Sequence, residues 1–484
     1  MPGMTILAPV VCADVDHPLD SNAIEAFVKA EMRAGRIPGA SVAIVRDGGI
    51  LYQNGFGVAS PDGRSVTPQT AFILGSVSKS ITALGVMQLV EAGKIDLDAP
   101  VQRYVPWFRV ADEDASRLVT VRHLLNQTSG LPEAAGIKGL ADGDTSDGAL
   151  ERHVRLLANE PLTRPPGKAM QYCNYNYAVL GLIIQTVAGT SYEDYIQRNI
   201  FTPLDMRHSF TSQKAAEKQG MATGYRLWFG IPVAAPGLPF VRGLLPGGYL
   251  ISSAEDMAHY LIAHLNGGRY LDRSILSPEG MAELHRVSGV RPLGFHNAKS
   301  YAGYAMGWFA GEMAGVQVLH HGGSTPNFLT HVVMEPEKRQ GIVILTNAFA
   351  SNRLAEGVLT LLSGRPAPAV ESHRPLGVDW LPLPLIQIVA FLFSLWALRR
   401  WRRHPENRTR TVWGKTWRIG LPLLLDVAVV GWVAQQFAGI ELPLKIGLLY
   451  VPGPLILLMA CAAFAIVWAL IRTATSVQLL RSAV

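Results

Sequence analysis

Ser76 and Lys79 lie three residues apart at the start of an apolar segment with helical patterning, residues 80–90. In the first turn of a helix, residues three apart share a face, so this hydroxyl and this amine can touch. A serine hydroxyl is a poor nucleophile until a neighbouring base takes its proton. A lysine amine becomes that base only where burial or nearby positive charge lowers its pKa. The pair is therefore a candidate nucleophile and base, although a capping serine with a solvated lysine fits the same residues.

Tyr172 and Asn174 form a second candidate group, placed just before another apolar helical segment, residues 177–184. A phenol beside a lysine ammonium is expected to have a depressed pKa, so Tyr172 could carry a proton between nucleophile and leaving group. The amide of Asn174 can donate to and accept from a substrate amide. The alternative is that Tyr172 belongs to an aromatic core cluster with Tyr175 and Tyr177.

A third candidate segment, His321-Gly322-Gly323-Ser324, begins where a strand pattern ends. Glycines leave the backbone open to close approach, so a main-chain N–H there can point at an oxyanion. An ordinary glycine turn is the alternative for this segment. Each of the three groups is weak evidence alone, and their combination carries the prediction.

The elements that must position these residues indicate an α+β fold with an embedded helical lobe. Strand patterns occur near both ends of residues 14–364, with a long helical and loop-rich middle, so we expect an antiparallel sheet completed by distant parts of the chain. The predicted elements are a helix at 21–35, hairpin strands at 41–45 and 50–56, strands at 304–309, 316–320, 328–334 and 341–346, and a helix at 351–362.

Composition excludes several function classes for the folded part. The chain has 43 Lys and Arg and 37 Asp and Glu. From Arg365 onwards there are 13 basic and 5 acidic residues, so the part before Arg365 has 30 basic and 32 acidic residues. The basic character therefore belongs to the C-terminal region, and nucleic-acid binding loses its main support. Only three cysteines occur, far apart in sequence, so we expect neither a disulfide framework nor a metal cluster.

The C-terminal region, residues 381–484, contains three apolar stretches at about 381–398, 419–437 and 448–471. Each is long enough to cross a bilayer core of roughly 30 Å, so a membrane domain is predicted, with buried helices of a soluble domain as the alternative. Residues 399–418 carry eight Lys and Arg, which the positive-inside rule places in the cytoplasm. The C-terminus is then cytoplasmic, and residues 14–364 lie outside the cytoplasm, joined to this multi-pass membrane region by a proline-containing linker at 365–380.

Two further features of the membrane prediction need an interpretation. Asp426 falls inside the second stretch, where an unpaired carboxylate is costly, and we favour a hydrogen-bonded helix contact over a proton or ion path. Residues 1–13 contain a short apolar run ending in Val11-Cys12-Ala13, which we interpret as a signal-peptide remnant because a basic start is missing.

Together, the motifs resemble those of the serine β-lactamase-related hydrolases, the group of class C β-lactamases, D-alanyl-D-alanine carboxypeptidases, penicillin-binding proteins and carboxylesterases. The family pattern is SxxK, YxN and then KTG or HxG, and the chain supplies Ser76–Lys79, Tyr172–Asn174 and His321–Gly323 in this order. The resemblance covers roughly residues 20–362. It implies a β-lactamase/transpeptidase-like fold, with an antiparallel sheet flanked by helices plus a helical lobe.

The resemblance also implies a two-step acyl transfer without a metal or an organic cofactor. Ser76 would attack a carbonyl, Lys79 and Tyr172 would manage the protons, and the backbone N–H groups of Ser76 and Ser324 would form the oxyanion hole. Asn174, His321 and Gly323 would contact substrate. Two departures stand out: histidine replaces the permanently charged lysine of the triplet, which weakens a β-lactamase assignment, and Cys173 occupies a position where small residues are usual.

Two function classes remain open at this stage. One is a membrane-anchored serine hydrolase acting outside the cytoplasm on an ester, amide or β-lactam carbonyl, with a D-alanyl peptide of the cell-wall type or an ester favoured. The other is a catalytically weak, penicillin-binding-like sensor or binding protein that signals through its transmembrane helices. The expected partners are a small-molecule or peptide substrate and the lipid bilayer, without nucleic acid, and the oligomeric state is open.

Overall fold

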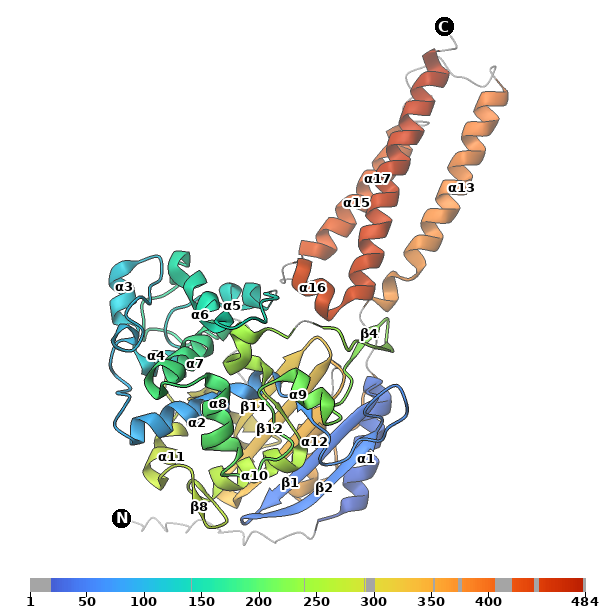
Figure 1. The fold of residues 1–484 in the computed structure, drawn as a ribbon. Coiled ribbons are helices and arrows are strands. Elements are labelled where there is room, and N and C mark those ends of the chain that lie inside the picture. Colours follow the sequence, from blue (N-terminus) through green and yellow to red (C-terminus); the bar gives the residue numbers. More distant parts are fainter. Residues whose placement is uncertain are drawn as a thin grey trace, which may run out of the picture.

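A computed structural model of the chain shows a mixed α/β body from which a bundle of helices projects (Figure 1). It describes residues 19–481 apart from 141, 239, 291, 293–300, 351–352, 373–376, 405–419 and 439–443. The predicted signal-peptide remnant at 1–13 and most of the basic loop at 399–418 lie outside the described residues.

A seven-stranded antiparallel sheet forms the centre of the body, in the order β2-β1-β13-β12-β11-β10-β9. The N-terminal hairpin joins the last strand of the domain, with Val42 opposite Ile344, so the predicted closure by distant parts of the chain is confirmed. The strands are β1 (Gly39–Arg46), β2 (Gly49–Gly57), β9 (Tyr301–Ala305), β10 (Trp308–Met313), β11 (Val316–Thr325), β12 (Phe328–Glu335) and β13 (Gln340–Thr346).

Both faces of the sheet are covered, because successive residues of each strand point to opposite sides. Val42 and Ile44 pack in the core formed with α1 (Ser21–Gly35) and α12 (Leu354–Leu362). Ala43 and Val45 belong to the larger core on the other side, with α2 (Ser78–Glu91) and α10 (Ala254–Leu265). A one-residue slip of register would exchange the two faces, so this alternation fixes the pairing.

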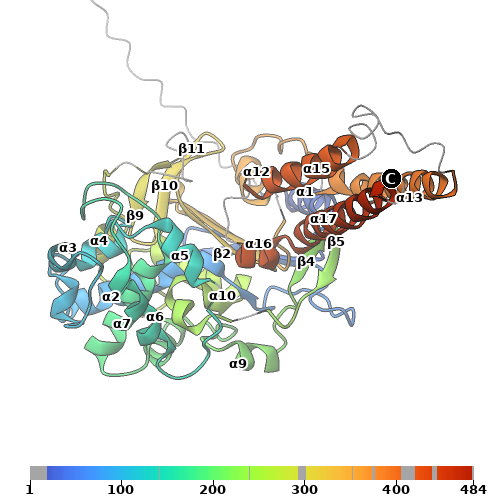
Figure 2. The same cartoon turned by 90° about the horizontal axis from the view of Figure 1, so that it is seen from above.

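The helical lobe lies between β2 and β9 in sequence and covers the outer side of α2 (Figure 2). Almost every residue of α2 is buried, since the helix lies between the sheet and α7 of the lobe. The remaining helices are α3 (Glu113–Leu118), α4 (Val121–Leu125), α5 (Glu133–Gly139), α6 (Ala149–Arg155), α7 (Asn174–Ala188), α8 (Tyr192–Ile196), α9 (Gln213–Lys218) and α11 (Pro278–Leu284). Short strand pairs join β3 (Phe72–Ile73) to β6 (Ile251–Ser252), β4 (Tyr225–Trp228) to β5 (Ile231–Ala234), and β7 (Arg269–Tyr270) to β8 (Arg273–Ser274). The predicted α+β class with a helical lobe is confirmed.

Two predicted strand boundaries are wrong, and glycine explains both. The strand predicted at 304–309 is split between β9 and β10, because Gly307 adopts a φ of +92° in the turn between them. The strand predicted to end at His320 continues to Thr325, and Gly322 and Gly323 pair with His331 and Thr330 of β12. Hydrophobic alternation cannot detect a strand through residues that have no side chain.

The C-terminal region forms α13 (Pro382–Arg403), α15 (Leu421–Ala438), α16 (Leu444–Tyr450) and α17 (Pro452–Arg481). Among the described residues, two helical segments are long and apolar enough to cross a membrane, 378–403 and 452–479. In the most apolar stretch of each segment, only 6% of the residues of 378–403 and 28% of those of 452–479 are buried. Core helices of a soluble domain are mostly buried. The prediction of three full spans is not met, because the apolar part of α15 is shorter than the other two segments. The third predicted stretch, 448–471, is also interrupted: α16 is a separate helix, and the long apolar helix begins at Pro452.

Asp426 on α15 forms an ion pair with Arg472 on α17. The interpretation of Asp426 as a helix contact is therefore confirmed. The pair crosses between two apolar helices, where each charge would be costly without the other. Its position favours one fixed arrangement of α15 against α17.

Gly307 offers a test of how closely the sheet must approach α2. A Cβ at Gly307 would lie 2.6 Å from the Cα of Ser80, so Gly307→Ala must displace backbone beside the Ser76–Lys79 turn. We expect it to lower the free energy of unfolding by about 1–3 kcal/mol more than a matched control, measured by urea titration. Gly63→Ala is that control, because Gly63 has a similar φ of +89° and nothing within 4 Å of its added Cβ. Equal losses in both variants would contradict the close-packing account.

Candidate active site

Ser76 lies in a single 3₁₀ turn, Gly75–Val77, that leads directly into α2. The end of β11 passes this turn at very short range: a Cβ on Gly75 would lie 2.4 Å from the backbone nitrogen of Ser324. A Cβ on Gly323 would lie 2.0 Å from the carbonyl oxygen of Leu74. Only glycines at both positions permit this approach, and it places the backbone of Ser324 beside Ser76.

The Lys79 amine is the centre of the site's hydrogen-bond network. Its Nζ lies 3.0 Å from Ser76 Oγ and 2.8 Å from Asn174 Oδ1. It also donates to the carbonyl of Gly247, at 2.5 Å, in the turn Leu245–Tyr249 (η6). Three separate parts of the chain therefore converge on one amine, and the predicted proximity of Ser76, Lys79 and Asn174 is observed.

Burial gives this amine its chemistry. Lys79 is 0% exposed, and burial lowers its pKa to about 7 because removal from water disfavours the ammonium form. Near neutral pH a large share of the amine is therefore unprotonated. An unprotonated amine 3.0 Å from a hydroxyl can accept that hydroxyl's proton.

Tyr172 occupies the other side of the nucleophile. Lys79 Nζ lies 4.8 Å from the centre of its ring, and its hydroxyl lies close to Ser76. The expected depressed pKa is wrong: burial, and then the neighbouring phenol of Tyr304, hold the pKa of Tyr172 well above its ordinary value. Burial acts on Lys79 at the same time, so the ammonium charge that was expected to lower this pKa is itself weakened. Tyr172 is a neutral donor in this environment.

The segment carrying Tyr172 and Asn174 is held by Gln127, a residue that belongs to none of the three motifs. Gln127 is fully buried with a φ of +59°, a conformation that costs energy in a residue other than glycine. Its Oε1 accepts from the backbone N–H of Cys173 at 2.9 Å and from Asn176 Nδ2 at 2.5 Å, and its carbonyl accepts from Gln171 N–H. No motif in the sequence pointed to this role.

The two alternatives considered for the aromatic residues near Tyr172 apply to different side chains. Tyr175 and Tyr177 are core residues, and the Tyr177 hydroxyl donates to the carbonyl of Leu125. Cys173 is also buried, and burial raises the pKa of its thiol to about 12, so it packs as a neutral group. Tyr172 alone of this group contacts Ser76 and stands at the site.

His321 lies within the site but is only 1% exposed. Its Nδ1 is 2.6 Å from the carbonyl of Gly322, a geometry that requires the proton on Nδ1, and its Nε2 is 3.3 Å from the Tyr304 hydroxyl. The ring centre is 6.1 Å from that of Tyr172. His321 is therefore packed among aromatic rings, unlike the free cation that a lysine would present here.

A family model described as β-lactamase matches residues 24–362, about seven tenths of the chain. The chain belongs to the β-lactamase family. "Penicillin-binding protein 4" of Amycolatopsis lactamdurans is 31% identical over 368 residues, covering 72% of this chain and 92% of that protein. "Protein flp" of Staphylococcus aureus strain MRSA252 is 29% identical over 417 residues, covering 84% of this chain and 80% of that protein.

Among solved structures, the octameric penicillin-binding protein homologue from Pyrococcus abyssi matches with a TM-score of 0.62 and 29% identity. The match covers 75% of this chain and 80% of that chain. Membership of the β-lactamase family establishes the β-lactamase/transpeptidase-like fold and serine hydrolase chemistry in general. The resemblance stated from the three motifs is thereby confirmed.

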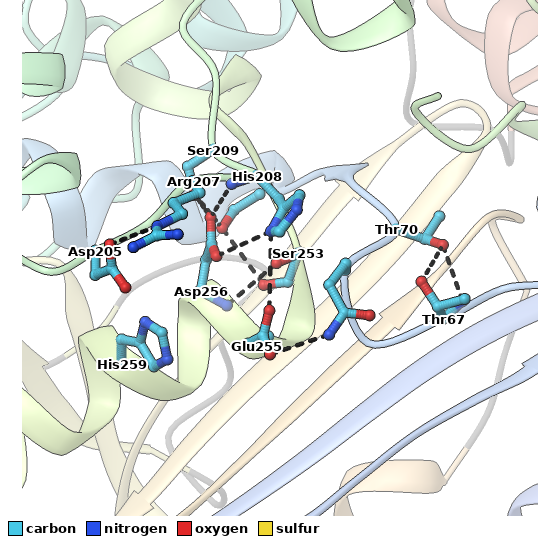
Figure 3. A network of polar contacts seen from close by, with 12 residues as sticks. Thr67, Thr70, Asp205, Arg207, His208, Ser209, Ser253, Glu255, Asp256 and His259 are labelled. Atoms are coloured by element: carbon cyan, nitrogen blue, oxygen red, sulfur yellow. Dashed lines mark hydrogen bonds and ion pairs between the residues drawn. The ribbon is translucent and has the colours of Figure 1, made fainter. Parts of the chain in front are cut away.

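A second polar cluster of this β-lactamase-family domain, made by His208, Glu255 and Asp256, lies at the start of α10 (Figure 3). Asp256 accepts from the backbone N–H of His208 at 2.7 Å and from Ser209 Oγ at 2.6 Å, and burial raises its pKa. Ser253 caps the same helix through the N–H of Asp256. These bonds connect the 205–209 loop to α10. We therefore interpret the cluster as a structural one that fixes the loop against the helix.

The pKa of Lys79 predicts the pH dependence of any reaction at Ser76. Below about 7 the ammonium form prevails and cannot accept a proton, so the rate of Ser76 acylation should fall about tenfold per pH unit there and level off above. The measurement is the second-order rate of labelling by a fluorophosphonate between pH 5 and 9. Lys79→Arg, which stays charged, should lose about a thousandfold in rate and show no such limb. An unchanged profile in Lys79→Arg would contradict the assignment.

Proposed function

We propose that this protein is a membrane-anchored serine hydrolase that forms an acyl-enzyme on Ser76. The observation that carries the proposal is the 3.0 Å contact between Ser76 Oγ and a fully buried lysine amine whose pKa is lowered to about 7. A capping serine with a solvated lysine would show neither the burial nor the convergence of Asn174 and Gly247 on Nζ.

In the proposed acylation step, Ser76 Oγ bonds to the substrate carbonyl carbon while its proton passes to Lys79 Nζ. Tyr172 then donates its phenolic proton to the leaving group as the scissile bond breaks, and it recovers a proton from Lys79. The raised pKa of Tyr172 supports this order, because a neutral phenol has a proton to give.

The oxyanion formed during attack requires donors at the place where charge develops. The backbone N–H groups of Ser76 and Ser324 are the proposed donors, and the close approach of β11 to Gly75 supports this role. Loss of one such donor costs about 3 kcal/mol of barrier in comparable sites. Water, activated by Lys79 or Tyr172, then attacks the acyl-enzyme and releases the acid. Asn174, His321 and Gly323 would contact the substrate.

We infer an ester or a D-alanyl peptide as the substrate in preference to a β-lactam. The packed imidazole of His321 supports the ester most directly, because a substrate carboxylate, which β-lactams and D-alanyl-D-alanine peptides both carry, is served best by a permanent cation at this position. The names of two relatives, a penicillin-binding protein and a penicillin-binding protein homologue, support a peptide or penicillin-type ligand. A small-molecule or peptide substrate fits all of these.

The apolar helices at 378–403 and 452–479 support an anchor in the bilayer. Residues 14–364 would form the hydrolase domain, residues 365–380 the linker, and residues 381–484 the membrane domain. With the basic loop at 399–418 in the cytoplasm, two or three spans would place the hydrolase domain outside it. The substrate is then one met outside the cytoplasm.

The direct test of this proposal is covalent labelling of the full-length protein in detergent. A fluorescent fluorophosphonate or penicillin should label the wild type at Ser76, and Ser76→Ala should abolish labelling. Ser80→Ala is the matched control, since it removes a buried hydroxyl on the next turn of the same helix, bonded to the carbonyl of Val77. Labelling that persists in Ser76→Ala would contradict the choice of nucleophile.

A substrate panel then separates hydrolase from sensor. Esters of p-nitrophenol, a D-alanyl-D-alanine peptide and nitrocefin should give Ser76-dependent turnover with at least one class, the esters or the peptide being expected. A stable adduct on Ser76 with no turnover of any class would contradict the hydrolase and favour the binding or sensing function.

A further inference from the structure

The C-terminal helical region returns to the candidate active site at α16. The last residue of this helix, Tyr450, lies close to the side chain of Ser324. Its ring packs edge-on against that of Phe349, with 5.1 Å between the ring centres. Figure 2 shows α16 against the hydrolase domain, at the end of the bundle nearest to it. A residue 88 positions beyond the end of the family match therefore contacts the segment that carries a proposed oxyanion donor.

The position of Tyr450 is fixed by packing on both sides. Ile446 of α16 is 1% exposed, and the N–H of Val451 donates to the carbonyl of Gly447 to close the helix. Just beyond it, Gly453 meets the hairpin of β4 and β5, where an added Cβ would lie 3.1 Å from Phe229. Tyr450 is thus held between the hairpin and the end of β11.

Tyr249, Phe349 and Tyr450 form what we call the aromatic wall. Tyr249 follows directly on the Gly247–Gly248 turn whose carbonyl holds Lys79, and its phenol is close enough to Tyr450 for the two to interact electrostatically. Phe349 keeps 36% of its surface exposed, so the wall offers free apolar area. The aromatic wall lies beside Ser324. Its apolar surface is therefore next to the position of the substrate carbonyl that Ser76 would attack.

We propose that Tyr450 is a substrate-positioning residue contributed by the C-terminal region, and that the aromatic wall selects substrates with an apolar acyl group beside the scissile carbonyl. This inference rests on the proposed function of Ser76. Apolar area buried against the wall stabilises binding in proportion to the contact, at about 25 cal/mol per Å². Longer acyl chains should therefore gain more than short ones.

The location of the wall supports the same substrate class. Helix α17 begins at Pro452, two residues after Tyr450, and its apolar segment runs from there to Leu479. If this segment spans the bilayer, its first turn lies at the membrane surface and Tyr450 with it. Amphiphiles with an apolar acyl chain concentrate at that surface.

The test compares full-length wild type with Tyr450→Ala and Tyr450→Phe in detergent micelles. The readout is the second-order rate of Ser76 labelling by methyl and octyl fluorophosphonates, which needs no turnover. We expect Tyr450→Ala to reduce the octyl rate about tenfold, the effect of losing roughly 50 Å² of apolar contact, and to change the methyl rate less than twofold. Tyr450→Phe keeps the ring and should retain the preference for octyl. Leu444→Ala, at the exposed end of the same helix, is the matched control and should match wild type.

The outcomes separate this inference from the function beneath it. If neither probe labels Ser76 in the wild type, the proposed function fails. Two outcomes would contradict the positioning role while both probes label the wild type. In one, Tyr450→Ala lowers the methyl and octyl rates equally, and in the other it lowers neither rate. Should Tyr450→Ala fail to fold, Phe349→Ala alters the wall from the hydrolase side and should lose the octyl preference in the same way. An octyl preference that survives in Phe349→Ala would overturn the proposal.

Discussion

The burial of one lysine amine is the constraint on which the rest of the structure depends. An amine can be removed from water only where its hydrogen bonds are replaced, and Lys79 finds acceptors on Ser76, Asn174 and Gly247. These acceptors come from the start of α2, the start of α7 and the turn before β6, so the helical lobe and the sheet must meet at this point. The same burial that turns the amine into a base also disfavours its charged form in the folded state. The burial of Lys79 is therefore the origin both of its reactivity as a base and of a cost in the stability of the folded state.

Close backbone approaches bring the oxyanion side of the site into place. Gly75 and Gly323 allow the end of β11 to lie against the turn of Ser76, and Gly307 lets the β9–β10 turn lie against the next turn of α2. None of these contacts is local in sequence, because β11 is positioned by β12 and β13, and β13 in turn pairs with β1 near the N-terminus. Folding of the site therefore requires closure of the whole sheet. Along β1, successive residues join the two cores in turn, with Val42 and Ile44 in one and Ala43 and Val45 in the other, and this alternation fixes the register of the closure.

Sequence patterns could predict the fold class and the contact between Ser76 and Lys79, because these depend on order, spacing and helical periodicity. The patterns could not show that β11 continues through Gly322 and Gly323, since glycine carries no hydrophobic signal. Nor could they give the direction of the pKa of Tyr172, which depends on burial by residues distant in sequence, Tyr304 among them. Gln127 was missed for a related reason: its role lies in a left-handed backbone and two hydrogen bonds that leave no motif.

The C-terminal region shows the limit of reasoning by domains. Composition separates residues 365–484 from the hydrolase so clearly that an anchor is the natural interpretation, and an anchor could be attached anywhere on the surface. Instead α16 returns to the hydrolase domain, where Tyr450 packs against Phe349 and lies close to Ser324 at the end of β11. The ion pair of Asp426 with Arg472 connects α15 to α17, which begins two residues after Tyr450. Helix packing within the C-terminal region is thereby connected to the segment beside Ser76. Under the proposed membrane anchoring, the bilayer would take part in determining which acyl groups can reach this serine.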